Sequence, residues 1–156
     1  MLIKRKILVA FLALFALLGS AAGAGARGLS SSEASLLQTM NSVRTSQGLA
    51  PLRLDVRLLR AARGHSSDMM QRQYFAHGAV AARALAQRAR GPVYGEDLAW
   101  GTGVTAQWVV DEWLASPRHR AVMLRRGFRR IGIGIAFGTF AGHSGAAVVT
   151  ADFAGR

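Results

Sequence analysis

The sequence IGIGIAFG, residues Ile131–Gly138, alternates a large apolar residue with a small one along its whole length. A period of two predicts a β-strand, and the glycines within it predict close approach by a packed helix. A second run with β-strand character covers residues 147–153, and residues 139–145 between the two runs have the character of a loop. The end of the chain is therefore predicted to form an antiparallel hairpin.

Helical spacing dominates the chain before this hairpin. Ser30 and Glu33 have the spacing of a capping box, which predicts the start of a helix that Gly48 and Pro51 bring to an end. Further helices are expected over residues 55–78, 79–90 and 104–114 and from Pro117 onward, with an extended segment over residues 93–100. Helices followed by strands predict the α+β class, with helices packed on a small antiparallel sheet.

The N-terminal residues have the pattern of a secretory signal peptide. Three basic residues at positions 4–6 precede an uncharged apolar run over residues 7–18, which is shorter than the ~20 residues of a membrane span. Small residues follow, and cleavage is expected after Ala26. We therefore expect a signal peptide over residues 1–26 and a single domain over residues 27–156 that is secreted or held in the periplasm or cell envelope. An uncleaved N-terminal anchor is the alternative.

Composition limits the chemistry and the partners of this domain. The chain has no cysteine, which excludes disulfides, thiolate zinc sites and a cysteine nucleophile. Without the three basic residues of the leader, the net charge of +12 falls to +9. On an exported protein this charge favours anionic envelope polymers or lipid headgroups as partners. The arginines lack the spacing and the interleaved aromatic residues of a nucleic-acid motif, so no nucleic-acid partner is expected.

Four short stretches occur in the order that is typical of one protein family. They are Ala62–Met69 (ARGHSSDM), Tyr74–His77 (YFAH), Gly95–Ala99 (GEDLA) and Trp113–Arg120 (WLASPRHR). With the trailing IGIG of Ile131–Gly134, they make the chain resemble the CAP superfamily, in its bacterial extracellular branch of SCP-like proteins. Its relatives include cysteine-rich secretory, venom allergen and plant pathogenesis-related proteins. The resemblance covers nearly all of the expected domain and implies an α-β-α sandwich with a small central antiparallel sheet flanked by helices.

The resemblance also implies a surface cleft that holds two histidines and one or two acidic residues. His77 matches the first cleft histidine, Glu96 matches the glutamate of the family's Gly-Glu-Asn segment, and His119 matches the second histidine. The eukaryotic branch has a further glutamate where this chain has Ser116. Glu112 is close in sequence but is expected to point elsewhere on its helix, so Ser116 and Glu112 are the weaker candidates.

Two imidazoles and a carboxylate support two kinds of chemistry. If neutral imidazoles of His77 and His119 face one point, they form a site for a divalent metal such as zinc. The carboxylate of Glu96 beside an imidazole would fix its tautomer and raise its pKa. Both uses need the side chains to converge, and the sequence has no local metal motif that would guarantee it. The expectation that these side chains converge therefore rests on the family resemblance. The family has an asparagine where this chain has Asp97.

Three functions remain open from the sequence. A binding module for lipids, sterol-like molecules or anionic envelope polymers agrees best with the positive charge and requires no complete catalytic set. A divalent-metal-dependent hydrolase would use His77 and His119 as ligands, with Glu96 as general base or as the group that orients a ligand. A structural exported domain would use the polar cluster only for folding.

Overall fold

The computed structural model describes residues 28–156, so the signal peptide expected over residues 1–26 lies outside the described part of the chain. Five helices are present there: α1 (Ser31–Ser46), α2 (Val56–Arg72), α3 (Val80–Ala86), α4 (Ala106–Ala115) and α5 (Pro117–Met123). The strands are β1 (Arg53–Leu54), β2 (Val93–Thr102), β3 (Phe128–Phe140) and β4 (His143–Gly155). Among the residues described, no helix is both long and apolar enough to cross a membrane.

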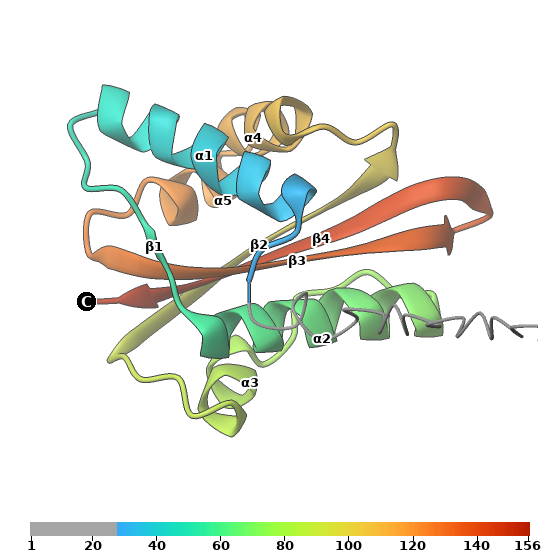
Figure 1. Ribbon diagram of the computed structural model, residues 1–156, viewed down its shortest axis with the longest axis horizontal. Coiled ribbons are helices and arrows are strands. Elements are labelled where there is room, and N and C mark those ends of the chain that lie inside the picture. The colour runs from blue at the N-terminus through green and yellow to red at the C-terminus, as the bar shows by residue number, and fades with distance from the viewer. Residues whose placement is uncertain (1–27) are drawn as a thin grey trace, which may run out of the picture.

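The strands form one sheet in the order β1-β3-β4-β2, with helices on both faces. Helices α1, α4 and α5 cover one face and helices α2 and α3 cover the other (Figure 1). The three long strands pair antiparallel, and the two-residue β1 adds a parallel pair with β3. The predicted α+β class and α-β-α sandwich are confirmed. β1 was not predicted, because two residues are too few to show a period of two.

Helix α2 lies directly on β3 because two glycines leave room for its backbone. A Cβ atom at Gly132 would lie 2.0 Å from the carbonyl carbon of Leu58, and one at Gly134 would lie 2.4 Å from that of Ala62. Ser66 of α2 also donates a hydrogen bond of 2.9 Å to the carbonyl oxygen of Gly134. The close helix approach predicted from the glycines is therefore confirmed.

Three boundaries differ from the sequence-based prediction. Helix α3 ends at Ala86 and not near residue 90, and Arg88 just after it has a positive φ of 60°. Helix α2 ends at Arg72 and not near Gly78, because Gln73 adopts the left-handed conformation with φ of 55°. Residues 74–79 consequently form a loop. The predicted hairpin is confirmed, but its turn is reduced to Ala141 and Gly142, with φ of 49° and 82°. Positive φ at both central residues matches the twist of two paired strands, so β3 and β4 extend further than predicted.

Candidate functional site

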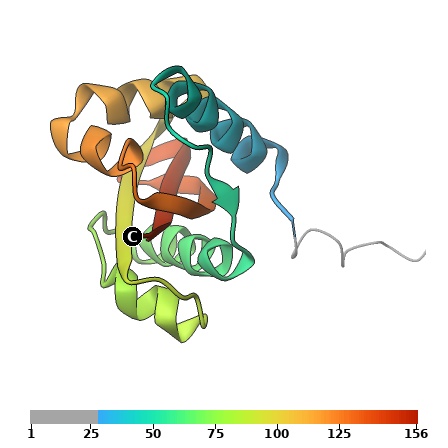
Figure 2. The ribbon, with the colours of Figure 1, turned by 90° about the vertical axis from the view of Figure 1, so that its left-hand side faces the viewer.

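The edge strand β2 carries the central carboxylate of the site. Figure 2 shows β2 at one edge of the sheet, next to β4. Glu96 of β2 is directly opposite Asp152 of β4 in the antiparallel register. Opposite residues of an antiparallel pair point to the same face, so both carboxylates point to the face that α2 and α3 cover. The side chain of Glu96 is only 3% exposed and that of Asp152 is fully buried.

A guanidinium group from α3 joins these two carboxylates. Nη2 of Arg83 donates to Asp152 Oδ1 at 3.1 Å and forms a second ion pair with Oε2 of Glu96. Burial nevertheless raises the pKa of Asp152 to about 7, against the lowering effect of Arg83. Sequence reasoning missed both residues. Asp152 had a signal, since a carboxylate inside an apolar strand requires a partner, whereas Arg83 was one of many arginines.

Glu96 also fixes the orientation of His77. Nδ1 of His77 lies 2.9 Å from Oε1 of Glu96, and since a carboxylate only accepts, Nδ1–H is the donor. The loop between α2 and α3 carries His77, whose side chain is 58% exposed. Its other ring nitrogen, Nε2, is therefore the one left for a ligand. His65 of α2 is buried, and its Nε2 lies 3.1 Å from the carbonyl oxygen of Ala76, as expected for a histidine of the core.

Helix α5 brings the second histidine to the same place. The ring centroids of His77 and His119 are 6.1 Å apart, with 53° between the ring planes. Burial lowers the pKa of His119, and the neighbouring His77 lowers it further. At neutral pH His119 is therefore a neutral imidazole, able to accept a hydrogen bond or to bind a metal. His77, Glu96 and His119, far apart in sequence, are brought together at the β2 edge.

An aromatic hollow of about 240 Å³ adjoins the histidine pair, and we call it the imidazole hollow. Its lining consists of Phe75, Leu98, Ala99, Trp100, Trp108, Glu112, Trp113, Ser116 and His119. Glu112, which was expected to point elsewhere on its helix, and Ser116 are both among these lining residues. All three tryptophans of the chain line this hollow.

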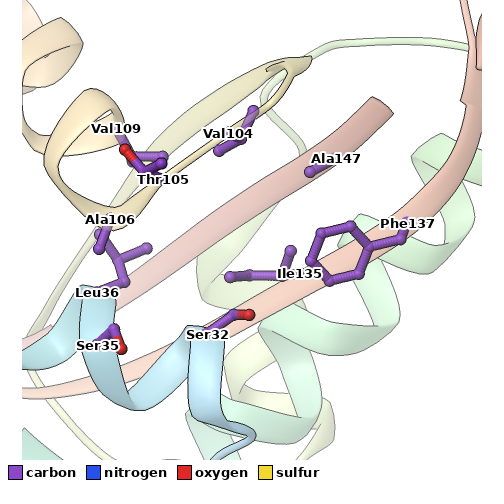
Figure 3. A pocket seen from close by; sticks show the side chains of 10 residues that line it. All are labelled: Ser32, Ser35, Leu36, Val104, Thr105, Ala106, Val109, Ile135, Phe137 and Ala147. Atoms are coloured by element: carbon purple, nitrogen blue, oxygen red, sulfur yellow. The ribbon is translucent and has the colours of Figure 1, made fainter. Parts of the chain in front are cut away.

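A second hollow lies on the other side of α4. Figure 3 shows this apolar groove of about 180 Å³, formed by residues of α1, of the start of α4 and of the hairpin strands. Leu36, Val109 and Ile135 form its walls, and Phe137 lies at its border with 64% of its surface exposed. Ser32 and Ser35 add the only side-chain hydroxyls from α1. The groove is thus mainly hydrocarbon with a polar margin.

The histidine pair fits a divalent metal only in part. Two imidazoles on one tetrahedral zinc, with Zn–N bonds of ~2.0–2.1 Å, hold their ring centroids about 5 Å apart. The ring centroids of His77 and His119 are 6.1 Å apart, so the two side chains would have to move closer together to share one ion. Within residues 28–156, however, no group of three His, Asp or Glu side chains is placed to hold a metal ion. Glu96 is already engaged by His77 and Arg83.

Comparisons with known proteins agree with this architecture. Residues 37–153 match the family model described as CAP, the cysteine-rich secretory protein family. Two Bacillus subtilis proteins, the uncharacterized membrane protein YlbC and the uncharacterized protein YkwD, are each 33% identical to the chain, over 109 and 111 residues. The matches cover 67% and 68% of this chain but only 31% and 43% of those relatives.

Solved structures share the same fold at lower identity. An extracellular protein of Bacillus anthracis that contains an SCP domain superposes with a TM-score of 0.71 at 23% identity, over 80% of this chain and 40% of that one. An outer surface protein of Borrelia burgdorferi gives a TM-score of 0.67 at 19% identity, over 78% and 90% of the two chains. The family match, the two relatives and the shared sandwich lead to one conclusion: this chain belongs to the CAP family of cysteine-rich secretory proteins.

Proposed function

We propose that the protein is an exported binding module that takes an anionic lipid, or another anionic amphiphile of the cell envelope, into the imidazole hollow. One observation carries the proposal: a wall of aromatic side chains ends at a pair of imidazoles. An aromatic wall favours an apolar or ring-shaped group, and imidazoles bind an anionic headgroup by hydrogen bonds, more strongly when protonated.

The engagement of Glu96 supports binding over catalysis. A general base must be free to accept a proton from a substrate or a water molecule. Glu96 instead is buried, accepts from Nδ1 of His77 and pairs with the guanidinium of Arg83. Its role in this proposal is to hold the His77 ring so that Nε2 is presented to the ligand.

Charge and export are consistent with the proposal. The net charge of +9 that remains without the leader attracts anionic ligands, and the expected leader would deliver the domain to the envelope where such ligands occur. Two of the structural relatives carry the descriptions "extracellular" and "outer surface". N-terminal sequencing of the exported protein tests the leader, and a first residue at position 27 is expected.

Tryptophan fluorescence tests the binding site, since all three tryptophans line it. Monomeric lysophosphatidylglycerol should shift the emission, while the zwitterionic lysophosphatidylcholine should bind more weakly. The double variant His77→Ala with His119→Ala should weaken the binding of the anionic amphiphile about tenfold. Gln38→Ala, which changes an exposed side chain of α1 outside the lining, serves as the control. An unchanged affinity in the double variant would refute the proposed site.

A divalent-metal site is the second candidate, because two imidazoles with ring centroids 6.1 Å apart lie near the separation of about 5 Å that a shared zinc ion requires. His77 and His119 would hold the ion, which would supply Lewis acidity or orient an anionic ligand. Calorimetric titration with zinc should then show one site in the wild type that both His77→Ala and His119→Ala abolish. Identical titration curves for all three proteins would exclude a metal site at these histidines, and with it the metal-dependent hydrolase.

A purely structural role for the cluster makes a different prediction. In that case Glu96→Gln should lower the melting temperature, and the fraction of the variant that stays folded should bind the amphiphile with unchanged affinity. Loss of amphiphile binding at an unchanged melting temperature would count against the structural role and for a binding site.

A further inference from the structure

The sheet topology gathers arginines at the end opposite the hairpin turn. The first residues of β2 and β3 and the last residues of β4 meet there, since Val93 and Phe128 both pair with Gly155. Arg53 of β1 pairs with Arg130 of β3 at the same end. Figure 2 looks onto this end of the sheet, with the C-terminus toward the viewer.

Two adjoining hollows, each of about 480 Å³, open at this end. One is lined by Pro92, Gly127, Arg129, Arg130, Gly155 and Arg156. The other is lined by Ala50, Pro51, Arg53, Arg129 and Arg130. Arg129 and Arg130 belong to both hollows, and no aspartate or glutamate side chain lines either of them. We call the pair of hollows the arginine end.

A β-bulge explains why two successive arginines serve the same hollows. In a regular strand, neighbouring side chains point to opposite faces. The pairing of β3 with β4 shifts register between Phe128 and Arg130, which leaves Arg129 as the extra residue. Bulges of this kind re-aim a side chain at a functional edge. The carboxylate of Asp55 at 2.9 Å holds one guanidinium nitrogen of Arg130 in place.

A buried guanidinium behind the arginine end both orders its backbone and adds to its positive charge. Arg44 of α1 is completely buried and donates to the carbonyl oxygens of Met123, Arg125 and Phe128 at 2.6, 3.3 and 3.2 Å. These bonds fix the segment that leads into Arg129. The partners of Arg44 are carbonyl oxygens, and no carboxylate within residues 28–156 forms an ion pair with it. Burial and the nearby charge of Arg129 both lower its pKa.

We infer that the arginine end is a second binding site, distinct from the imidazole hollow, for a linear phosphodiester polymer of the cell envelope whose repeating unit lacks a base, such as a polyol phosphate. Successive phosphates would occupy the two hollows, with Arg129 and Arg130 between them. A tetrahedral phosphate presents oxygens in more than one direction, so two guanidinium groups from different hollows can share it.

The lining favours this polymer over the other polyanions. Bases of a single-stranded nucleic acid would need aromatic side chains for stacking, and neither hollow has one. A membrane surface would favour apolar side chains that insert beside the charges. The exposed large apolar residues, including Phe75, Leu85 and Phe137, lie outside both linings. A thin, flexible and purely polar chain fits concave hollows that lack both features.

The test measures binding of poly(glycerol phosphate) to the purified protein as a function of salt. The double variant Arg53→Gln with Arg129→Gln should bind about tenfold or more weakly at low salt. The slope of log K against log salt should fall by roughly 1.4, at ~0.7 for each phosphate that an arginine no longer neutralises. The matched control, Arg118→Gln with Arg120→Gln, removes the same charge from exposed positions of α5 and should leave the slope unchanged.

Further arms separate the alternatives. Arg53→Gln with Arg156→Gln removes one arginine from each hollow without touching β3, so it replaces the first variant if that one unfolds. The variant lacking His77 and His119 should keep full polymer binding, which separates this inference from the proposed function. Equal losses in the control variant, or equal binding of poly-uridylate RNA or of phosphatidylglycerol vesicles by the arginine end, would overturn the inference.

Discussion

Asp97→Asn is expected to stabilise the protein at neutral pH, because it removes a carboxylate that is sealed in the core. Asp97 is fully buried, and neither of its oxygens has a hydrogen-bond partner in the described part of the chain. Its neighbours on the same face of β2 are Gly95, which faces Val122 of α5, and Ala99 of the main core. Burial, together with the smaller effect of the neighbouring charge of Glu96, raises the pKa of Asp97 to about 8.

The size of the effect follows from proton linkage. The folded protein keeps a proton on Asp97 that the unfolded chain, with a pKa near 3.8, releases above pH 4. Asp97 therefore does not reduce the free energy of unfolding below pH 4, and it reduces this free energy increasingly as the pH rises toward 8. At about 1.4 kcal/mol for each pH unit, the loss at pH 7 is about 4 kcal/mol. In the variant, the buried amide that replaces the carboxyl group would also lack partners, which costs ~1–3 kcal/mol. The free energy of unfolding of Asp97→Asn at pH 7 is therefore expected to exceed that of the wild type by roughly 1–3 kcal/mol.

Urea unfolding of wild type and Asp97→Asn at pH 4.5 and 7.5 measures this gain. The variant should be more stable at pH 7.5. At pH 4.5 the linkage loss of the wild type is only about 1 kcal/mol, so the gain should disappear or become a loss of up to ~2 kcal/mol. Asp111→Asn, on the exposed side of α4, is the matched control and should change little at either pH. A gain of equal size at both pH values, or a loss at pH 7.5, would refute the reasoning.

Three further predictions concern packing, titration and the buried guanidinium. Gly134→Ala should lower the free energy of unfolding by about 3 kcal/mol, because its Cβ would meet the α2 backbone, whereas Gly64→Ala, with open space around it, should gain ~0.5–1 kcal/mol in urea unfolding. Proton NMR titration should place the pKa of His119 below its ordinary value, and His77→Ala should raise it only part of the way, since burial is the larger cause. Arg44→Met should lower the melting temperature by about 10 °C in a calorimetric scan, because four carbonyl oxygens lose their donor and two of these bonds are buried.

Most of the fold was predictable because it is encoded by local periodicity. The capping box at Ser30 is present, with its serine and Glu33 exchanging both hydrogen bonds. The alternation over Ile131–Gly138 predicted both the strand and the helix that lies on it. The end of α2 was not predictable, because Gln73 has no intrinsic preference for positive φ and only tertiary contacts hold the loop after it.

The candidate site was predictable only where the family resemblance supplied the spatial information. His77, Glu96 and His119 carry no local motif, and each could equally have been a surface or capping residue. Arg83 and Asp152 belong to none of the stretches that carry the resemblance, and their contact joins elements 69 positions apart. Periodicity within one element cannot reveal such a contact, since it depends on which strands become neighbours.

The neighbouring carboxylates Glu96 and Asp97 show how one edge strand separates two environments. Strand alternation sends Glu96 toward Arg83 and the solvent-reaching His77, and sends Asp97 into the core. Glu96 and Asp152 lie opposite each other, and Arg83 forms an ion pair with both. Two buried carboxylates this close repel each other unless a positive charge lies between them. The orientation of the His77 ring therefore depends, through Glu96, on a guanidinium group that α3 places on this face of the sheet.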